Sequence, residues 1–245
     1  MQDRYQYFFN IKEHVNKSIL NIRNLPDKFI LNAEYLENEF IPQLGLNDEM
    51  LNEMPTELSM YYGKGLHLWQ YPNQLSKYLV FLALNAKQIH SYMEIGCRWG
   101  GTFILVNEWL KRCGSELDFS IAVDPIPKTP FIEQYEEISQ HKIFYYQGLS
   151  TDLKFQNIYK SANPNFVFID GDHTLVGVMN DHLLVRKFAK FIAHHDISSI
   201  TCRDTSFFWD YVKLSEDNFE AFEFTQQYES VNGSYLGIGV LRRRY

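Results

Sequence analysis

The stretch from residue 165 to residue 173, Asn-Phe-Val-Phe-Ile-Asp-Gly-Asp-His, places two acids and a histidine directly after an unbroken apolar run. Such a run is typical of a strand that is buried on both faces, as in a parallel sheet. Open α/β sheets bind their ligands outside the carboxyl ends of the strands. We therefore expect Asp170, Asp172 and His173 where the chemistry takes place, with Gly171 allowing a tight turn between them.

A second short strand ends in the same way. Residues 190–193 lead into His194, His195 and Asp196. Two neighbouring strands that end like this bring oxygen and nitrogen ligands to one point, so we expect His195 and Asp196 to meet Asp170 there. For His194 we expect a structural or surface role.

A glycine turn precedes both stretches. Residues 91–95 are expected to form a strand, and apolar positions recur at helical spacing after residue 102. Between them, Glu94 is followed by Gly96, Gly100 and Gly101 in the spacing G-x-x-x-G-G. This is neither the dinucleotide-binding pattern nor a phosphate loop. The glycines let a ligand approach the backbone, and the helix N-terminus offers free N–H groups.

The next apolar strand, residues 119–123, is followed by Asp124. An acid one strand–helix unit after the glycine turn can accept hydrogen bonds from both hydroxyls of a ribose. A turn-forming role before Pro125 is the alternative, and the position of the acid favours the binding role. A strand around residues 143–146 comes next, and Ser150 after it is expected near the same nucleoside.

Strands and helices alternate along the rest of the chain, which predicts an α/β fold with a doubly wound, mostly parallel sheet. The last two strands have no helix between them, which predicts one antiparallel strand. Further helices are expected around residues 132–139, 175–183 and 207–212, and further strands at 219–224 and 236–240.

Residues 1–70 look unlike the rest, and we predict that they form a helical cap or lid on a main domain of residues 71–245. Helical spacing predicts a helix over most of the first 24 residues. A dimer surface is the alternative role of this segment. The loop that ends it contains His67, Trp69 and Tyr71, which either line a substrate pocket or hold the loop on the sheet.

The composition narrows the class of partner. Acids outnumber Lys plus Arg by 30 to 23, for a formal charge of -7, which argues against a nucleic-acid backbone as the main partner. The three cysteines are scattered, which suggests a reducing cytoplasm. No apolar stretch is long enough for a membrane span, and the N-terminus shows no secretory pattern, so a cytoplasmic location is expected.

Four motifs in this order resemble the class I S-adenosylmethionine-dependent methyltransferases: the glycine turn at 94–101, Asp124, the motif at 168–173 and the His-Asp-Ile at 195–197. The most similar branch contains the macrocin O-methyltransferases and the cephalosporin-hydroxylase-like sugar O-methyltransferases. The resemblance runs from about residue 71 to the C-terminus. It implies a seven-stranded sheet with the last strand antiparallel. It also implies that the glycine turn binds the methionine part of S-adenosylmethionine and that Asp124 binds its ribose.

The resemblance also implies a divalent cation, Mg²⁺ or Mn²⁺, beside the methyl acceptor. Asp170 and Asp196 match its ligands, and His195 stands where another acid is common. Because Mg²⁺ prefers oxygen ligands, this imidazole is a departure from the pattern. The resemblance places the catalytic base at Asp172 or His173. A capping or core role is the alternative for His173, and its position directly after Asp-Gly-Asp favours the catalytic one.

The predicted function is therefore metal-assisted O-methylation of a sugar or glycosylated small molecule, and the resemblance suggests pairing as a homodimer. A bound cation lowers the pKa of an acceptor hydroxyl, and a nearby imidazole can take its proton. Three alternatives stay open: N-methylation of a small amine, an inactive methyltransferase fold, and a non-heme iron oxygenase using His173, His195 and Asp196. The oxygenase would leave the glycine turn and Asp124 without a purpose. Asp181 is expected at the surface or as a structural hydrogen-bond acceptor.

Overall fold

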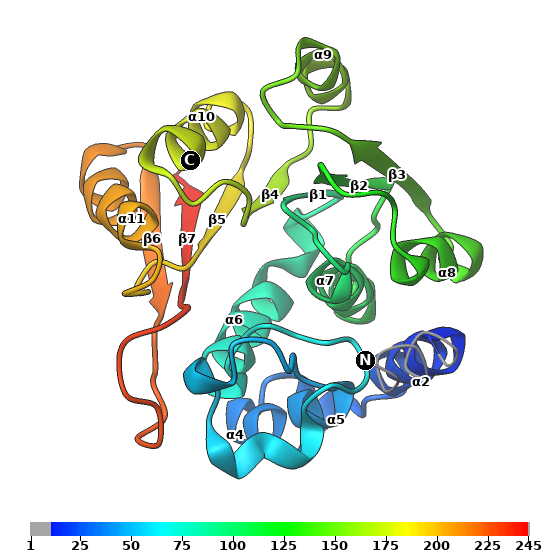
Figure 1. The fold of residues 1–245 in the computed structure, drawn as a ribbon. Coiled ribbons are helices and arrows are strands. Elements are labelled where there is room, and N and C mark those ends of the chain that lie inside the picture. Colours follow the sequence, from blue (N-terminus) through cyan, green and yellow to red (C-terminus); the bar gives the residue numbers. More distant parts are fainter. Residues whose placement is uncertain (1–10, 245) are drawn as a thin grey trace.

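The computed structural model describes residues 11–244, and the part of the predicted first helix that falls on residues 1–10 lies outside this range. Seven strands form one sheet in the order β3-β2-β1-β4-β5-β7-β6 (Figure 1). Their bounds are β1 Ser91–Ile95, β2 Phe119–Asp124, β3 Lys142–Gln147, β4 Phe166–Ile169, β5 Phe191–His195, β6 Phe219–Phe224 and β7 Ile238–Arg243. Strands β1 to β5 pair in parallel, and β7 is antiparallel to both of its neighbours. The predicted fold class is confirmed.

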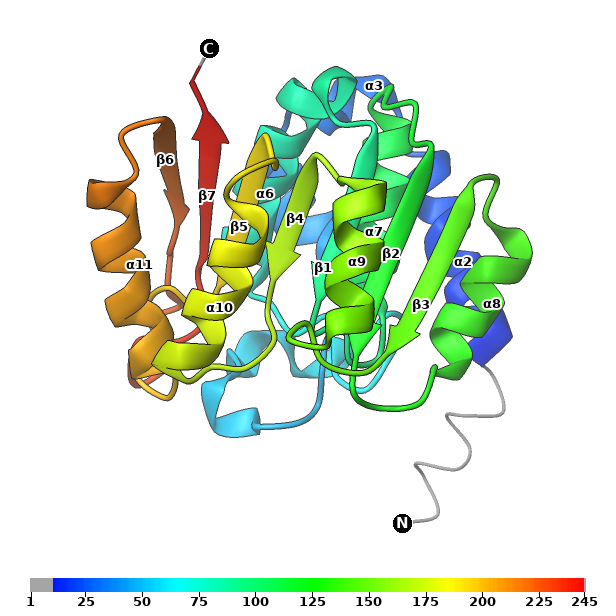
Figure 2. The same cartoon turned by 90° about the horizontal axis from the view of Figure 1, so that it is seen from above.

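Helices cover both faces of the sheet (Figure 2). One face carries α6 Pro72–Asn85, α7 Gly101–Arg112 and α8 Pro130–Ile138. The other carries α9 Leu153–Ala162, α10 Leu175–Val185 and α11 Arg203–Ser215. Buried strand residues point alternately to the two layers, because successive side chains of a strand face opposite ways. For this reason β4 is apolar along its whole length, whereas β1 is buried along its whole length and includes the polar residues Ser91 and Glu94.

The N-terminal segment packs against the helices of the first face. Helix α2, Ile11–Arg23, contacts α7 and α8. Its buried residues Ile11, Val15, Ile19 and Ile22 belong to the same apolar core as α6 and α7. Short helical turns then lead to α6: α3 Asp27–Ile30, α4 Ala33–Tyr35, the π-helical η1 Leu36–Phe40, α5 Ile41–Leu44, η2 Leu51–Glu53 and η3 Thr56–Tyr61. A further turn, η4 Ala86–Gln88, ends the connection to β1.

A buried ion pair anchors α2 to α7. The Arg23 Nε atom donates to Glu108 Oε2 over 2.6 Å, and Glu108 is almost fully buried. Glu108 also accepts a hydrogen bond from the Tyr135 hydroxyl and pairs with Lys111. Because a buried carboxylate needs such partners, α2 is part of the folded core, and the division at residue 70 stays a prediction. Among the described residues, none of the helices has the length and apolar composition that crossing a membrane requires.

Candidate active site

A cavity of about 1010 Å³ lies over the carboxyl ends of the parallel strands. Its wall combines the glycine turn, the segments after β2, β3, β4 and β5, and the N-terminal segment. The parallel register of β4 and β5, with Ile169 opposite His194, brings the residues after these two strands to one edge of the sheet. This is the place at which open α/β sheets bind ligands, and the volume is at the upper end for small-molecule sites.

The glycine turn is held by close backbone packing. Gly96 has φ +83°, and a Cβ atom there would lie 1.9 Å from the carbonyl oxygen of Asp170. A Cβ on Gly101 would lie equally near the carbonyl oxygen of Leu66. We expected these glycines to make room for a ligand. At both positions the missing side chain instead makes room for the chain's own backbone, although both glycines also line the cavity.

Arg98 joins the glycine turn to the N-terminal segment. It adopts φ +42°, which is uncommon outside glycine. Its guanidinium group forms an ion pair with Glu49 and lies 4.8 Å from the centre of the Trp69 ring. These two contacts of Arg98 hold the loop of the N-terminal segment against the cavity wall. The sequence analysis missed it, because neither Arg98 nor Glu49 belongs to a recognisable pattern.

Asp124 at the end of β2 organises the backbone around it. Its Oδ2 atom accepts a hydrogen bond from the Arg98 N–H over 2.7 Å, and its Oδ1 atom accepts one from Ile126 N–H over 3.1 Å. Asp124 therefore has the turn-forming role that was one of the two alternatives. It also lines the cavity, and each carboxylate oxygen retains a second lone pair for a ligand hydroxyl.

The remaining residues expected on the cofactor side also line the cavity. Glu94 is buried beside the Tyr92 hydroxyl, and burial holds the pKa of its carboxyl well above the usual range. The Ser150 hydroxyl donates to Asp181 Oδ1. Asp181 is buried, and burial raises its pKa to about 6. The prediction of a surface position for Asp181 is wrong, and that of a structural acceptor is confirmed.

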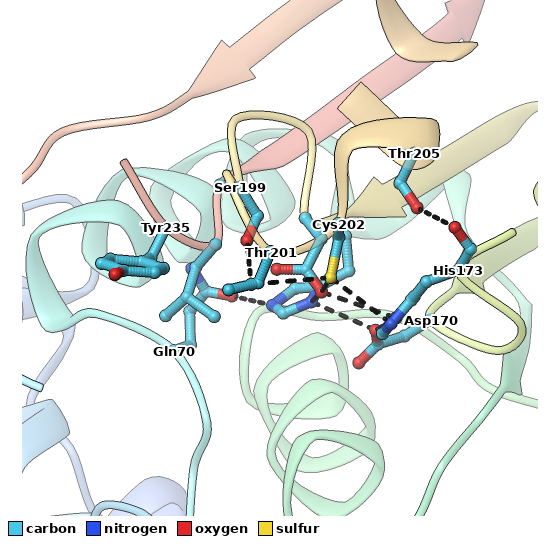
Figure 3. Close-up of polar contacts among 12 residues, drawn as sticks. Gln70, Asp170, His173, Ser199, Thr201, Cys202, Thr205 and Tyr235 are labelled. Carbon is cyan, nitrogen blue, oxygen red and sulfur yellow. Dashed lines mark hydrogen bonds and ion pairs between the residues drawn. The ribbon is translucent and has the colours of Figure 1, made fainter. Parts of the chain in front are cut away.

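Asp170, His173, His195 and Asp196 form one polar cluster at the ends of β4 and β5; Figure 3 shows Asp170 and His173 within it. The Nε2 atom of His173 lies 3.1 Å from Asp170 Oδ1 and 3.5 Å from Asp196 Oδ2. The Nδ1 atom of His195 lies 3.1 Å and 3.4 Å from the same two oxygens. The structure thus brings together the three expected metal ligands and adds His173 to them. Asp196 adopts φ +57°, a conformation that often marks functional sites.

The charges of this cluster support one another. Hydrogen bonding to Asp170 is the main reason why the pKa of His173 is raised to about 10. Burial opposes ionisation of His195, but the carboxylates of Asp170 and Asp196 hold its pKa well above the usual range. Burial likewise opposes ionisation of Asp170, yet the two histidines hold its pKa well below the usual range. Two imidazolium groups can thus balance two carboxylates, and His173 in this state has no lone pair for a proton.

Two residues that the sequence analysis missed support the histidines (Figure 3). Gln70 Oε1 is the partner of His195 Nε2. The Cys202 Sγ atom lies 3.5 Å from His173 Nδ1 and 3.4 Å from Asp196 Oδ2. Neither residue could be assigned from the sequence, because glutamine at a loop end and a lone cysteine carry no functional pattern.

Of the other residues singled out from the sequence, some line the cavity and others lie in the core. Asp172 lines the cavity, and its Oδ1 atom accepts a hydrogen bond from Thr174 N–H at the start of α10. His194 is buried 3.1 Å from a ring nitrogen of His182, which confirms a structural role. Among the aromatic loop residues, Trp69 lines the cavity, as does His67, whereas Tyr71 is buried and donates its hydroxyl to the Glu53 carbonyl.

The side chains fit a bound divalent cation, although not the oxygen-rich kind of site that suits Mg²⁺. His195 is only 6% exposed, and its Nδ1 atom lies 3.1 Å from Asp170 Oδ1 and 3.4 Å from Asp196 Oδ2. Such an atom, directed at two carboxylates, is typical of a metal ligand. Mg²⁺ demands near-octahedral oxygen ligands, and two of the four inward atoms of this cluster are nitrogens.

Comparison with known proteins supports the fold. No protein-family model matches the chain, and no curated protein matches it. Among solved structures, the O-methyltransferase TomG from Streptomyces achromogenes, in complex with S-adenosylmethionine, is 12% identical with a TM-score of 0.50, covering 73% of this chain and 82% of its own. A Klebsiella pneumoniae protein assigned as an O-methyltransferase is 14% identical with a TM-score of 0.50, covering 91% and 93%. The chain therefore has the Rossmann-like fold of these S-adenosylmethionine-dependent methyltransferases.

Proposed function

We propose that the chain is an S-adenosylmethionine-dependent O-methyltransferase that acts on a hydroxyl group of a sugar or glycosylated small molecule. The main support is that one cavity joins the glycine turn and Asp124 to the polar cluster after β4 and β5. The fold that the chain shares with the solved O-methyltransferases agrees with this proposal. The acceptor type rests on the lining of the cavity and on the resemblance of the motifs.

The cofactor would lie on the side of the cavity formed by β1, β2 and β3. Six lining residues would hold it: Glu94, Gly96, Gly100, Gly101, Asp124 and Ser150. The N-terminus of α7 begins at this turn and offers backbone N–H groups to a carboxylate. Asp124 retains lone pairs for the ribose hydroxyls. When bound, S-adenosylmethionine supplies a methyl group activated by its positively charged sulfur.

The acceptor would lie between the polar cluster and the N-terminal segment. Met50, Glu53, His67 and Trp69 form this part of the wall. Trp69 lines this wall beside Arg98, aromatic rings pack against sugar rings, and the buried Nε1–H of Trp69 makes no hydrogen bond with the described residues. An acceptor with several hydroxyl groups can satisfy this donor. The segment would therefore act as part of the acceptor pocket.

Methyl transfer requires the acceptor oxygen in line with the methyl carbon and the sulfur. The carbon–oxygen bond forms while the carbon–sulfur bond breaks, the bonding pair remains on sulfur, and the hydroxyl proton passes to a base. We expected His173 to take this proton. Its Nε2 atom instead faces Asp170 and Asp196 in the polar cluster, so we assign the role to Asp172, the other predicted base, which lines the same cavity.

A divalent cation held by Asp170, His195 and Asp196 is part of the proposal. A cation at this position would lower the pKa of the acceptor hydroxyl and orient it. Mn²⁺ fits these residues better than Mg²⁺ does, because Mg²⁺ has the stronger preference for oxygen ligands.

A turnover assay tests the function. The full chain is incubated with methyl-labelled S-adenosylmethionine and a panel of free sugars, nucleotide sugars and glycosides, with simple amines for comparison. Mass spectrometry then identifies products that have gained one methyl group. We expect label on a hydroxyl of a sugar-containing acceptor. Exclusive labelling of amines would contradict O-methylation, and label on non-glycosylated alcohols alone would contradict the proposed acceptor class.

A further inference from the structure

Four of the distances between the inward atoms of the polar cluster suit ligands of one cation. His173 Nε2 and His195 Nδ1 each approach the same two oxygens, of Asp170 and Asp196, and the four distances lie between 3.1 and 3.5 Å. Bonds of about 2.0–2.2 Å from a divalent cation to nitrogen and oxygen place neighbouring ligand atoms roughly 3.0–3.5 Å apart. These four nitrogen–oxygen separations suit a shared cation, and Asp170, His195 and Asp196 offer ligand atoms that all lie within 4.8 Å of one another.

A chain of amide contacts fixes which nitrogen of His195 points inward. Gly237 N–H donates to Gln74 Oε1 over 3.1 Å, and Gln74 Nε2 donates to the Gln226 carbonyl over 2.8 Å. These backbone partners set the orientation of the Gln74 amide. Gln70 Nε2 then donates to Gln74 Oε1, which leaves Gln70 Oε1 to accept a hydrogen bond from His195 Nε2. In neutral His195 the lone pair is therefore on Nδ1 and faces the carboxylates.

His173 is arranged in a similar way. Its Nε2 atom faces the carboxylates, and its Nδ1 atom lies 3.5 Å from the Cys202 sulfur. The hydroxyl of Thr205 also approaches the His173 backbone carbonyl oxygen. Histidines that bind metals usually give their second ring N–H to another acceptor, which fixes the tautomer and the ring orientation. Both histidines of the cluster have such a partner.

We propose that this cluster binds one zinc-class divalent cation through Asp170, His173, His195 and Asp196, in preference to Mg²⁺, and that Gln70 is a positioning residue for His195. Imidazole nitrogens suit Zn²⁺, whereas carbonyl, carboxylate and water oxygens suit Mg²⁺. The role of the cation in methyl transfer rests on the proposed function. The assignment of its ligands rests on the geometry alone.

Calorimetric titration of the full chain tests the preference. The protein is treated with EDTA, desalted and titrated separately with zinc chloride and magnesium chloride. We expect one Zn²⁺ per chain, bound on the order of 10²-fold or more tightly than Mg²⁺. Equal or tighter binding of Mg²⁺ would overturn the proposal. So would the absence of Zn²⁺ binding, which would leave two imidazolium groups paired with two carboxylates.

Variants locate the bound cation. His173→Ala and His195→Ala should each weaken Zn²⁺ binding strongly, and unchanged affinity in both would show that Zn²⁺ binds elsewhere, against the proposal. His173 is partly exposed, so His173→Ala should fold even if the buried His195→Ala does not. Thermal melting of each variant checks the fold.

Gln70 has its own pair of variants. Gln70→Leu should weaken Zn²⁺ binding by about 10–100-fold, as expected for a residue that orients a metal ligand. Gln70→Glu keeps an acceptor oxygen towards His195 but turns its second oxygen towards Gln74 Oε1, so it should restore only part of the affinity. Gln43→Leu, at an exposed glutamine of the same segment, is the control and should have no effect. If Gln70→Leu and Gln43→Leu bind Zn²⁺ equally well, Gln70 is not a positioning residue.

Separate measurement of methyl transfer distinguishes the two proposals. If the chain binds Zn²⁺ through both histidines but transfers no methyl group, the proposed cation site is supported and the proposed function is wrong. If the chain transfers a methyl group but binds no Zn²⁺, the proposed function is supported and the proposed cation site is wrong.

Discussion

At the scale of single residues, the sequence predicts those site residues that directly follow strands. Asp170 and Asp196 were placed together because the ends of parallel strands meet at one edge of a sheet. Gln70, Arg98 and Cys202 could not be placed, because each reaches the site from a loop whose path depends on tertiary packing. The pKa of His173 was also unpredictable, since it depends on how the loop after β4 turns His173 towards Asp170 and on a contact with Cys202 from another loop.

The base assignment gives a prediction at this scale. Asp172→Asn should lower kcat by roughly 10²–10⁴-fold, because the asparagine amide cannot take the proton from the hydroxyl group of the methyl acceptor. Asp204→Asn is the matched control: Asp204 also accepts a backbone N–H at the start of α10, from Leu175. If both variants lose activity equally in the methyl-transfer assay, Asp172 acts only as a helix cap and the base is another group.

At the scale of elements, periodicity predicted the strands of the sheet and most of the flanking helices, but not α9. The expected strands at 91–95, 166–169 and 219–224 have the same bounds in the structure. Residues 24–70 were harder, because their helical turns are too short to show a period. Their contribution to the core and to the cavity wall depends on packing against distant parts of the chain, which a local pattern does not show.

Helix α2 should contribute strongly to stability. Ile22 is fully buried against the core, so Ile22→Ala should lower the free energy of unfolding by about 2–5 kcal/mol. Leu20 lies on the same helix and is 56% exposed, so Leu20→Ala should change it by less than about 0.5 kcal/mol. Urea denaturation measures both values. Equal small effects would mean that α2 is a loosely attached cap.

At the scale of the whole molecule, alternating strands and helices predicted the doubly wound sheet, and the missing helix before the last strand predicted its antiparallel direction. The sequence did not predict that the N-terminal segment would share one core with α6 and α7. This packing depends on apolar faces that are far apart along the chain. It explains how a segment without a recognisable motif supplies both part of the cavity wall and a contact to His195.

Global stability should depend on pH through half-buried histidines such as His141. Burial lowers the pKa of His141 to about 4, whereas an unfolded histidine titrates near 6.5. The unfolded chain therefore takes up the proton first, and the stabilisation present above pH 6.5 is lost as the pH falls towards 4. The melting temperature of His141→Gln should fall less over this interval than that of the unmodified chain. His90→Gln, at an exposed histidine, should leave the pH dependence unchanged.

The central claim is that the cavity over the carboxyl ends of the strands binds S-adenosylmethionine, and calorimetric titration of the full chain with this cofactor tests it most directly. We predict one site per chain. Asp124→Ala should weaken binding by about 1–3 kcal/mol, because the ribose loses its acceptor. Asp118→Ala, at an exposed acid just before β2, should not weaken it. An absence of binding, or equal affinity of the unmodified chain and Asp124→Ala, would contradict the claim.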